Sequence, residues 1–472
     1  MNRERTLIKN TTLYMIGSFT SKFLGFLMLP FYTHYLSTDN FGYFDIINTT
    51  IILLLPLVTF EINDGLYRYL LDSETTEQKS EIIASTISST IRNLLIFFII
   101  FMITVFIFPI RYSYLILPAL LSLILSDTWQ QIARGLKQNM LYSVSGVVYT
   151  FVMLSLNVIL IAVCGMKVDA LLYSNIAAGL SSFILIEWKL RIFRQMRTAK
   201  ISKPLRKNLI RFSLPLMPNA MNWWVINLSS RYLIFCFIGS DANGIYAVAN
   251  KFPSILILVN TIFNLAWQES AIAEYSSEDK DSFYTKMFNI YMKVQLSSML
   301  VLIPLTKILM RFMVDPGFYD AWKYTPLLYI STIFSSFSTF YGTGYLVSKE
   351  TRGALTTSIV SVVTNIGLSV LLIPLFGLQA AAFTNAFAFL IMWVIRYVQI
   401  KKFFKIEIDF KVFISLCVSI LAFFGLYYIN SGFVSYLLTA AGLMVFVIIN
   451  RDMLKRLIHI TSTRVRALSL NH

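Results

Sequence analysis

Apolar residues run along this chain in long stretches separated by short polar segments. Each stretch is about twenty residues long, which is enough to cross the hydrocarbon core of a bilayer as a helix. The fourteen spans predicted in this way cover residues 11–35, 41–66, 84–108, 113–133, 142–164, 169–188, 213–238, 243–270, 288–310, 324–346, 354–374, 378–398, 411–430 and 432–449. The pattern therefore predicts an all-α integral membrane protein. For the last two spans, a re-entrant pair is an alternative.

The distribution of basic residues predicts the orientation. With the N-terminus inside, the cytoplasmic segments carry 29 Lys and Arg, the outside loops carry 4, and 7 lie within or at the ends of spans. Cytoplasmic loops are enriched in Lys and Arg, so both termini are expected on the cytoplasmic side. The net charge of +16 then reflects topology and contact with anionic membrane lipids, and it does not indicate nucleic-acid binding.

Composition supports the membrane assignment and argues against an enzyme. Only 14% of the residues are charged, against about a quarter in soluble proteins. The 3 cysteines and 3 histidines are too scattered for a disulfide framework or a metal cluster. No P-loop, nucleotide-sugar loop or nucleophile motif occurs, and the longest predicted outside loop, 311–323, is too short for catalytic acids of a glycan polymerase. No cofactor is expected.

A short polar segment between apolar stretches, which we call the hinge, occurs twice in the sequence. LSTDNFGYFDIIN at 36–48 and IGSDANGIYAVAN at 238–250 align at a constant offset of 202 residues. The identical pairs are Asp39 and Asp241, Gly42 and Gly244, and Asn48 and Asn250. Glycine permits a tight reversal and aspartate is able to cap the next helix, so each hinge is predicted to be a first outside turn.

Two further matches occur in the same order. Residues 7–9 match 209–211 at the same offset, and the turn at 157–175 parallels the one at 365–385. Because six spans is an even number, both copies run in the same sense, as parallel lobes around a central cavity. The predicted parts are an N-lobe at 1–190, a basic linker at 191–212, a C-lobe at 213–400, two further helices at 401–450, and a basic tail at 451–472.

These motifs resemble a known family. The first-lobe pattern LYMIGSFTSKFLGFLMLPFYTHYLSTDNFGYFDI, the segments FSLPLMPNAMNWWVINLSSRYLI and SDANGIYAVANKF, and the turn FGLQAAAFTN are similar to polysaccharide repeat-unit flippases of the multidrug/oligosaccharidyl-lipid/polysaccharide exporter superfamily. The resemblance covers about residues 5–400. It implies a multi-pass protein of the bacterial cytoplasmic membrane that moves polyprenyl-diphosphate-linked oligosaccharides outward for O-antigen, capsule or exopolysaccharide synthesis.

Three cations are predicted inside the membrane, where charges are costly and each one is a functional candidate. Lys22 lies about 16 Å into the first span, Lys251 about 12 Å into span 8, and Arg231 in the outer third of span 7. Arginine and lysine suit a diphosphate. Pairing with internal acids, or snorkelling of Arg231, are alternatives. Snorkelling is also expected of three cations near span ends, Arg92, Lys293 and Lys307.

Carboxylates inside spans are candidates for coupling transport to a proton or sodium gradient. They are Glu61, Asp127 and Glu269. On the same face as Glu61, the i, i+4 pair Asp64–Arg68 is expected to form a local salt bridge.

Amide and aromatic side chains add a surface suited to a sugar. The candidates are Asn48, Asn222, Trp223, Trp224 and Asn250. The two tryptophans lie about ten residues into span 7, which is deeper than an interfacial belt.

Two other transport functions stay open. A drug or organic-cation exporter of the same superfamily would present a more acidic cavity, and a peptidoglycan-precursor lipid flippase is a close relative. The segment from Lys189 to Arg211, which includes most of the linker, carries nine basic residues, and this favours a solvated, lipid-facing segment, with docking of another polysaccharide assembly protein as the alternative.

Overall fold

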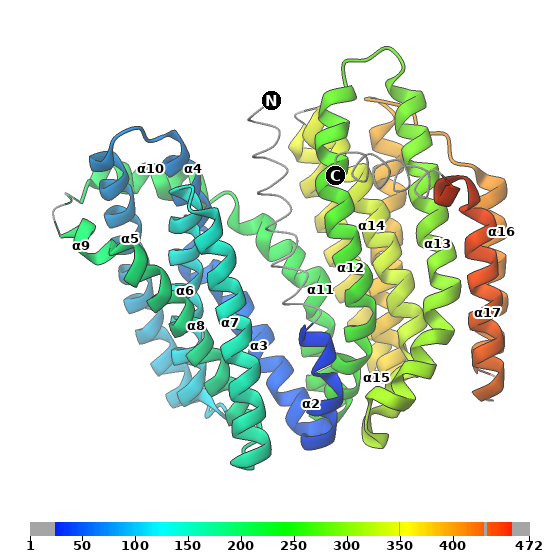
Figure 1. Ribbon diagram of the computed structural model, residues 1–472, viewed down its shortest axis with the longest axis horizontal. Coiled ribbons are helices and arrows are strands. Elements are labelled where there is room, and N and C mark those ends of the chain that lie inside the picture. The colour runs from blue at the N-terminus through cyan, green and yellow to red at the C-terminus, as the bar shows by residue number, and fades with distance from the viewer. Residues whose placement is uncertain (1–23, 198, 200, 349, 429–431, 456–472) are drawn as a thin grey trace, which may run out of the picture. The chain divides into compact units, whose positions relative to one another are not determined.

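The structure is a computed structural model that describes residues 24–197, 199, 201–348, 350–428 and 432–455. Every regular element within these residues is a helix (Figure 1). The chain forms two compact units, Met1–Ala247 and Val248–His472. The all-α fold predicted from the sequence is confirmed.

The first unit contains ten α-helices, the start of another and a short π-helix among the described elements. In order these are α2 (Leu29–Tyr35), α3 (Thr38–Thr59), α4 (Ile62–Asp72), α5 (Thr76–Ile107), α6 (Ser113–Gly135), α7 (Asn139–Val158), the π-helix η1 (Ile159–Val163), α8 (Val168–Leu190), α9 (Ile192–Met196), α10 (Lys203–Ser213), α11 (Met217–Phe237) and the beginning of α12 (Ser240–Glu274). Helix α5 begins with a complete capping box, in which Thr75 and Gln78 each bind the other's backbone.

The second unit holds the rest of α12 and the remaining described helices. They are α13 (Lys280–Met313), the 3₁₀ helix η2 (Pro316–Lys323), α14 (Thr325–Val347), α15 (Thr351–Ile400), α16 (Phe410–Tyr428) and α17 (Gly432–Ile449). Helix α15 carries two predicted spans, 354–374 and 378–398, which meet at a kink. Gly377 sits at the kink with φ 61° and ψ −139°, a conformation open to glycine.

The number of spans differs from the predicted fourteen. Within the part of the chain that the structure describes, ten helices are long and apolar enough to cross a membrane. Helix α15 counts once although it carries two predicted spans, α11 contributes only the short apolar stretch Leu228–Phe237, and α14, which corresponds to the predicted span 324–346, is not among the ten. Most of the first predicted span lies outside the described residues. The predicted span 41–66 is divided between α3 and α4 by a break at Phe60 and Glu61.

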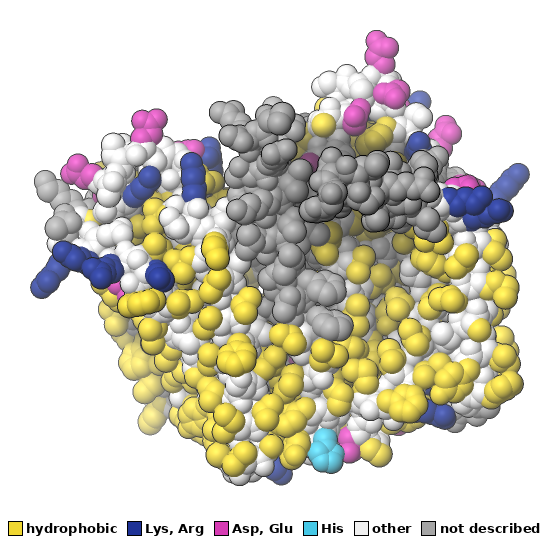
Figure 2. Space-filling view, viewed as in Figure 1, with side chains coloured by type: hydrophobic (Ala, Val, Ile, Leu, Met, Phe, Trp, Pro, Cys, Tyr) yellow, Lys and Arg dark blue, Asp and Glu magenta, His cyan; other side chains and the backbone are white. Residues whose placement is uncertain are grey.

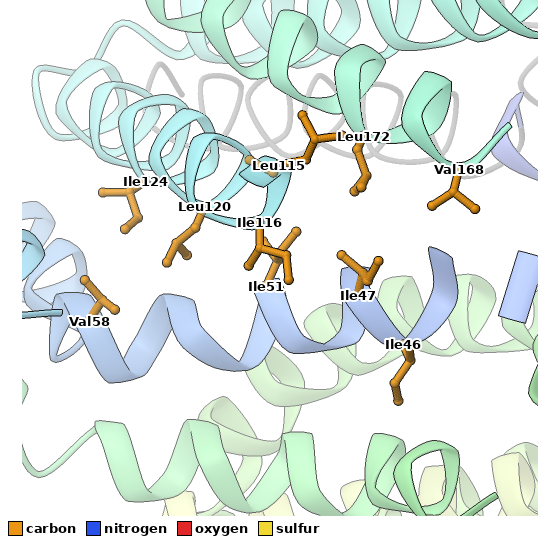
Figure 3. Packing of buried hydrophobic residues seen from close by; sticks show 11 residues of the cluster. Ile46, Ile47, Ile51, Val58, Leu115, Ile116, Leu120, Ile124, Val168 and Leu172 are labelled. Carbon is orange, nitrogen blue, oxygen red and sulfur yellow. The ribbon is translucent and has the colours of Figure 1, made fainter. Parts of the chain in front are cut away.

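Aliphatic side chains from three helices form one core of the first unit. Ile47 and Ile51 on α3 pack with Leu120 on α6 and Leu172 on α8, and all four are buried (Figure 3). A second cluster centres on Trp129, whose indole N–H donates to Glu187 Oε2 at 2.9 Å. The same carboxylate accepts from the backbone N–H groups of Ile192 and Phe193, which holds the start of the linker helix α9.

The outer faces of several helices carry large apolar side chains. On α5, Leu95 is 61% exposed, Ile99 59% and Phe106 91%. Figure 2 shows hydrophobic side chains along the flanks of the helices and charged side chains mainly near their ends. Such surfaces are stable in lipid and unfavourable in water, so the helices form a multi-pass membrane protein.

One of the predicted snorkelling cations is in fact buried. Lys307 is 2% exposed, and its ammonium donates to the backbone oxygen of Tyr427 at 3.0 Å. It also lies 3.8 Å from the ring centroid of Trp322. The snorkelling prediction is wrong for Lys307 because two aromatic rings and a carbonyl group solvate its charge inside the second unit. Of the other two, Lys293 forms a 3.7 Å ion pair with Asp409, and Arg92 is exposed.

Candidate functional site

The two copies of the hinge bind each other in the first unit. The hydroxyl of Thr38 donates to the carboxylate of Asp241, and the hydroxyl of Ser240 donates to the carboxylate of Asp39. The two bonds are related by the same offset of 202 residues as the sequence repeat. Both turns therefore lie at the same end of this unit, as parallel copies require.

The predicted capping role of the hinge aspartate is wrong for Asp39. Helix α3 is capped by Ser37, whose hydroxyl accepts from the backbone N–H of Asn40 at 3.3 Å. Asp39 lies in the first turn of the helix instead. From there its carboxylate reaches across to the other copy, a contact that no local sequence pattern predicts.

An ion pair joins α3 to α11 beside this contact. Nη1 of Arg231 lies 2.6 Å from Oδ1 of Asp45, and the two side chains are 18% and 13% exposed. The same nitrogen donates to the hydroxyl of Thr49 at 3.4 Å. Asp45 lies about 10 Å along α3 from its first residue. The candidate substrate cation Arg231 is therefore paired with an internal acid, the alternative left open by the sequence.

Aromatic and hydroxyl groups surround the ion pair. The indole N–H of Trp224 donates to the backbone oxygen of Thr49 at 3.2 Å. The hydroxyls of Tyr232 and Thr50 lie 2.5 Å apart, and the Trp224 and Tyr232 rings are 5.6 Å apart between centroids. Together with the ion pair, these groups form what we call the α3–α11 cluster, made of Asp45, Thr49, Thr50, Trp224, Arg231 and Tyr232. The sequence singled out only Trp224 and Arg231 as binding residues, and their partners on α3 were missed.

The other predicted binding residues lie outside the α3–α11 cluster, or outside the residues that the structure describes. Asn48 on α3 and Asn222 on α11 are half-buried. Asn250 and Lys251 lie on the part of α12 that belongs to the second unit, and both are half-buried and engaged in interactions. Lys22 and the side chain of Trp223 lie outside the described residues.

A second polar group in the first unit surrounds Asp127. The side-chain amide of Asn63 donates to Oδ2 of Asp127 at 2.6 Å, and the hydroxyl of Thr128 donates to Asn63 Oδ1 at 3.2 Å. Asn63 and Thr128 are buried at 4% and 2% exposure. The amide thus links α4 to α6 next to a carboxylate within the bundle. The sequence did not single out Asn63, and the only local indication was its position two residues after the candidate carboxylate Glu61.

The break between α3 and α4 gives Glu61 an unusual backbone. Phe60 and Glu61 both have a φ of 53°, in the left-handed region that non-glycine residues rarely adopt. Such residues cost of order 1–3 kcal/mol each and cluster at functional sites. Within the residues that the structure describes, we find no hydrogen bond or ion pair of the Glu61 carboxylate.

Two other predictions on acidic residues have different outcomes. Arg68 pairs with Asp72 at 2.7 Å, so the predicted Asp64–Arg68 bridge is wrong. Asp64 and Asp72 are both exposed and both lie four residues from Arg68, on the same face of α4, and nothing in the structure explains the preference for Asp72. Glu269 lies exposed on α12, apart from the cluster around Asp127 in the sequence and in a different unit. The described residues contain no group of three or more His, Cys, Asp or Glu that could hold a metal ion.

Arg396, near the cytoplasmic end of the predicted span 378–398, is one of the 29 Lys and Arg that the sequence assigned to the cytoplasmic side, but the structure buries it in the second unit. Arg396 on α15 is 4% exposed and donates to the hydroxyl of Thr357 at 3.0 Å, the backbone oxygen of Ser338 at 2.7 Å, and the hydroxyl of Ser358 at 3.2 Å. Gly342 makes room for it, since a Cβ there would lie 2.7 Å from Nη1. The arginine therefore ties α14 to both halves of α15.

Solved structures define the class of this fold. The chain is similar to the lipid II flippase MurJ in an inward closed conformation, with a TM-score of 0.67 and 16% identity over 95% of this chain and 100% of that one. An inward-facing multidrug resistance MATE family transporter of the MOP superfamily aligns with a TM-score of 0.66 and 13% identity over 80% of this chain and 94% of that one. The fold is thus that of membrane transporters.

The family follows from the sequence. Residues 7–268 match the family model described as polysaccharide biosynthesis protein. The match covers more than half of the chain, and the protein belongs to this family, as the resemblance predicted. No protein of curated function matches the chain by sequence.

Proposed function

We propose that this protein is a flippase that moves polyprenyl-diphosphate-linked oligosaccharide repeat units from the inner to the outer leaflet of the bacterial cytoplasmic membrane. The observation that carries the proposal is the Asp45–Arg231 pair, a charged contact inside a bundle whose outer surface is apolar. A partly buried guanidinium is the group best suited to a diphosphate, because its planar fork matches phosphate oxygens.

Alternating access requires that the bonded hinge copies separate and close again. They are held by two hydroxyl–carboxylate hydrogen bonds and a close backbone approach. Hydrogen bonds of this kind contribute about 0.5–3 kcal/mol net and re-form with water when they open. The contact is therefore weak enough to open during a transport cycle.

The ion pair gives the cycle a substrate-dependent step. An arriving diphosphate competes with Asp45 for Arg231, so substrate binding releases a bond between α3 and α11. Lys22 and Lys251 are proposed to supply further positive charge. Asn48, Asn222, Trp223, Trp224 and Asn250 are proposed to contact the sugars.

Coupling to a proton or sodium gradient is assigned to three carboxylates. The buried amide of Asn63 donates to Asp127, so a change in the charge of Asp127 changes this hydrogen bond between α4 and α6. Glu61 lies at the break between α3 and α4, where the backbone has a positive φ. Glu269 is the third. Both chain termini are proposed to lie in the cytoplasm, and other polysaccharide assembly proteins are proposed partners.

The substrate can be tested directly. The full-length protein, purified in mild detergent, should retain a polyprenyl-diphosphate-linked oligosaccharide detectable by native mass spectrometry. Arg231→Ala should lose this adduct. Retention of a peptidoglycan precursor would replace the proposed substrate with a related lipid. Transport of organic cations by proteoliposomes, with no lipid-linked glycan bound, would overturn the flippase proposal.

A further inference from the structure

A cavity opens where α15 passes into α16 in the second unit. It has a volume of about 470 Å³ and is lined by residues 405–408 together with Tyr397, Lys401 and Phe410. Helices α15 and α16 are both long and apolar enough to cross a membrane, and residues 401–409 are their short connection. The cavity therefore lies at the membrane surface, at the level of lipid headgroups.

The wall of this cavity is held by a ladder of side-chain bonds from α13. Three side chains, each four residues apart, accept from the backbone N–H of every second residue of the connection. Four residues of helix rise about 6 Å and two residues of extended chain about 6.6 Å, so the spacings match. The bonds run from Lys405 N to Asp281 at 3.0 Å, from Glu407 N to Thr285 at 3.1 Å, and from Asp409 N to Asn289 at 2.9 Å.

Because of this ladder, alternate residues of the connection differ in their contacts: one set is hydrogen-bonded to α13 and the other is buried. Residues 405, 407 and 409 direct their N–H groups toward α13, and the intervening Ile406 and Ile408 are buried. Thr285 and Asn289 also donate to the backbone oxygens of Lys405 and Glu407, at 3.4 Å and 2.8 Å. The cavity thus has a fixed backbone wall.

The side chains of the cavity combine positive charge with apolar surface. Lys401 and Lys405 are exposed, and the Lys401 ammonium lies 4.3 Å from the ring centroid of Tyr397. Phe410, at the start of α16, is 54% exposed. Glu407 adds one negative charge, so the three charged side chains of the lining carry a net charge of about +1 at neutral pH.

We propose that this cavity binds the headgroup of an anionic phospholipid. Lys401 and Lys405 contact the phosphate, the isoleucines and Tyr397 contact the glycerol region, and the acyl chains run along Phe410 and α16. A soluble anion would gain nothing from Phe410 or from the position between two spans. A zwitterionic headgroup would bring a positive charge toward two lysines.

The test is a lipid titration of the full-length protein followed by native mass spectrometry. Phosphatidylglycerol is the probe, with phosphatidylcholine as the zwitterionic comparison. Each lysine near a membrane surface contributes about a factor of five, so Lys401→Gln with Lys405→Gln should weaken phosphatidylglycerol binding roughly thirtyfold. Glu407→Gln should strengthen it. The matched control is Lys402→Gln, since Lys402 is the next residue but pairs with Glu350 at 2.5 Å.

Three outcomes would overturn the proposal. The double lysine variant could bind phosphatidylglycerol as tightly as the unaltered protein, or both lipids could bind equally well. Inorganic diphosphate could also displace the lipid at equal concentration, which would identify a site for free phosphate compounds. Thermal unfolding of each variant, compared with the Lys402→Gln control, separates loss of binding from loss of folding.

Discussion

The backbones of Gly42 and Gly244 pack directly against each other in the first unit. A Cβ placed on Gly42 would lie 2.8 Å from the backbone nitrogen of Gly244, and one placed on Gly244 would lie 3.2 Å from that of Gly42. The glycine that recurs in the two hinges therefore permits each copy to approach the other. Both residues lie inside helices, α3 and α12, and neither has a positive φ.

Replacing one of these glycines should open the contact. We expect Gly42→Val to cost about 1–3 kcal/mol as an overpacking change and to separate Thr38 from Asp241. The measurement is disulfide formation in a Thr38→Cys, Asp241→Cys variant whose native cysteines are replaced by serine. The cross-link should form in the parent and fail with Gly42→Val. Gly146→Val is the control, because a Cβ at Gly146 meets nothing within 4 Å. Equal cross-linking in all three would contradict the close approach.

The Asp45–Arg231 pair gives a second prediction. Arg231→Ala should abolish glycan export and lower stability by about 3–5 kcal/mol, since it leaves a partly buried carboxylate without its cation. Asp45→Asn with Arg231→Gln should recover most of the stability, because no unpaired charge remains.

Glycan export by the double variant shows whether Arg231 binds the substrate or only stabilises Asp45. We expect the double variant to remain inactive because the cation for the diphosphate is still missing. Export should be followed by surface glycan, and stability by thermal unfolding of the purified variants. Recovered export would mean that Arg231 serves only Asp45.

Coupling is predicted at Asp127. Asp127→Asn removes the charge that Asn63 binds, so flipping in proteoliposomes should lose its dependence on the imposed proton or sodium gradient. Glu61→Gln should act in the same direction. Exposed Glu77 on α5 offers a control that keeps the gradient response as Glu77→Gln. An unchanged response in the Asp127, Glu61 and Glu269 amide variants would remove all three from the mechanism.

Binding of the negatively charged substrate is predicted to require Lys22, which lies outside the described residues. Lys22→Ala should abolish export while the protein inserts at normal levels, since a lost charge-assisted contact weakens binding on the order of a hundredfold. Lys22→Arg should keep part of the activity, and Lys251→Ala should weaken export. Surface glycan and membrane protein levels are measured together. Full export by Lys22→Ala would contradict a cationic site for the diphosphate.

Topology is predicted by the basic residues and by the hinge contact. Reporter fusions at Gly42 and Gly244 should both report the outside, because the two hinges touch at one end of the first unit. A fusion at Lys200 should report the cytoplasm. Opposite sides for Gly42 and Gly244 would refute the parallel repeat.

The sequence by itself determined the helices and the family. Long apolar runs must form hydrogen-bonded helices in lipid, so the spans from α5 to α8 could be read from hydropathy alone. The apolar pattern also predicted the span at 324–346, which is α14, but it could not show that many serine, threonine and tyrosine side chains of this helix are buried against neighbouring helices. Burial on a neighbour rather than in lipid is a property of packing.

Only the tertiary structure decided which charges meet. The sequence identified Arg231, Asp127 and the two hinges, and the structure supplied Asp45, Asn63 and the bond between the hinge copies. It also moved Arg396 and Lys307 from the surface into the interior. The physical reason is range: hydropathy and helix periodicity act over neighbouring turns. A buried charge, by contrast, is stabilised by whichever polar group the fold brings within about 3 Å, and here Asp45 is 186 residues from Arg231.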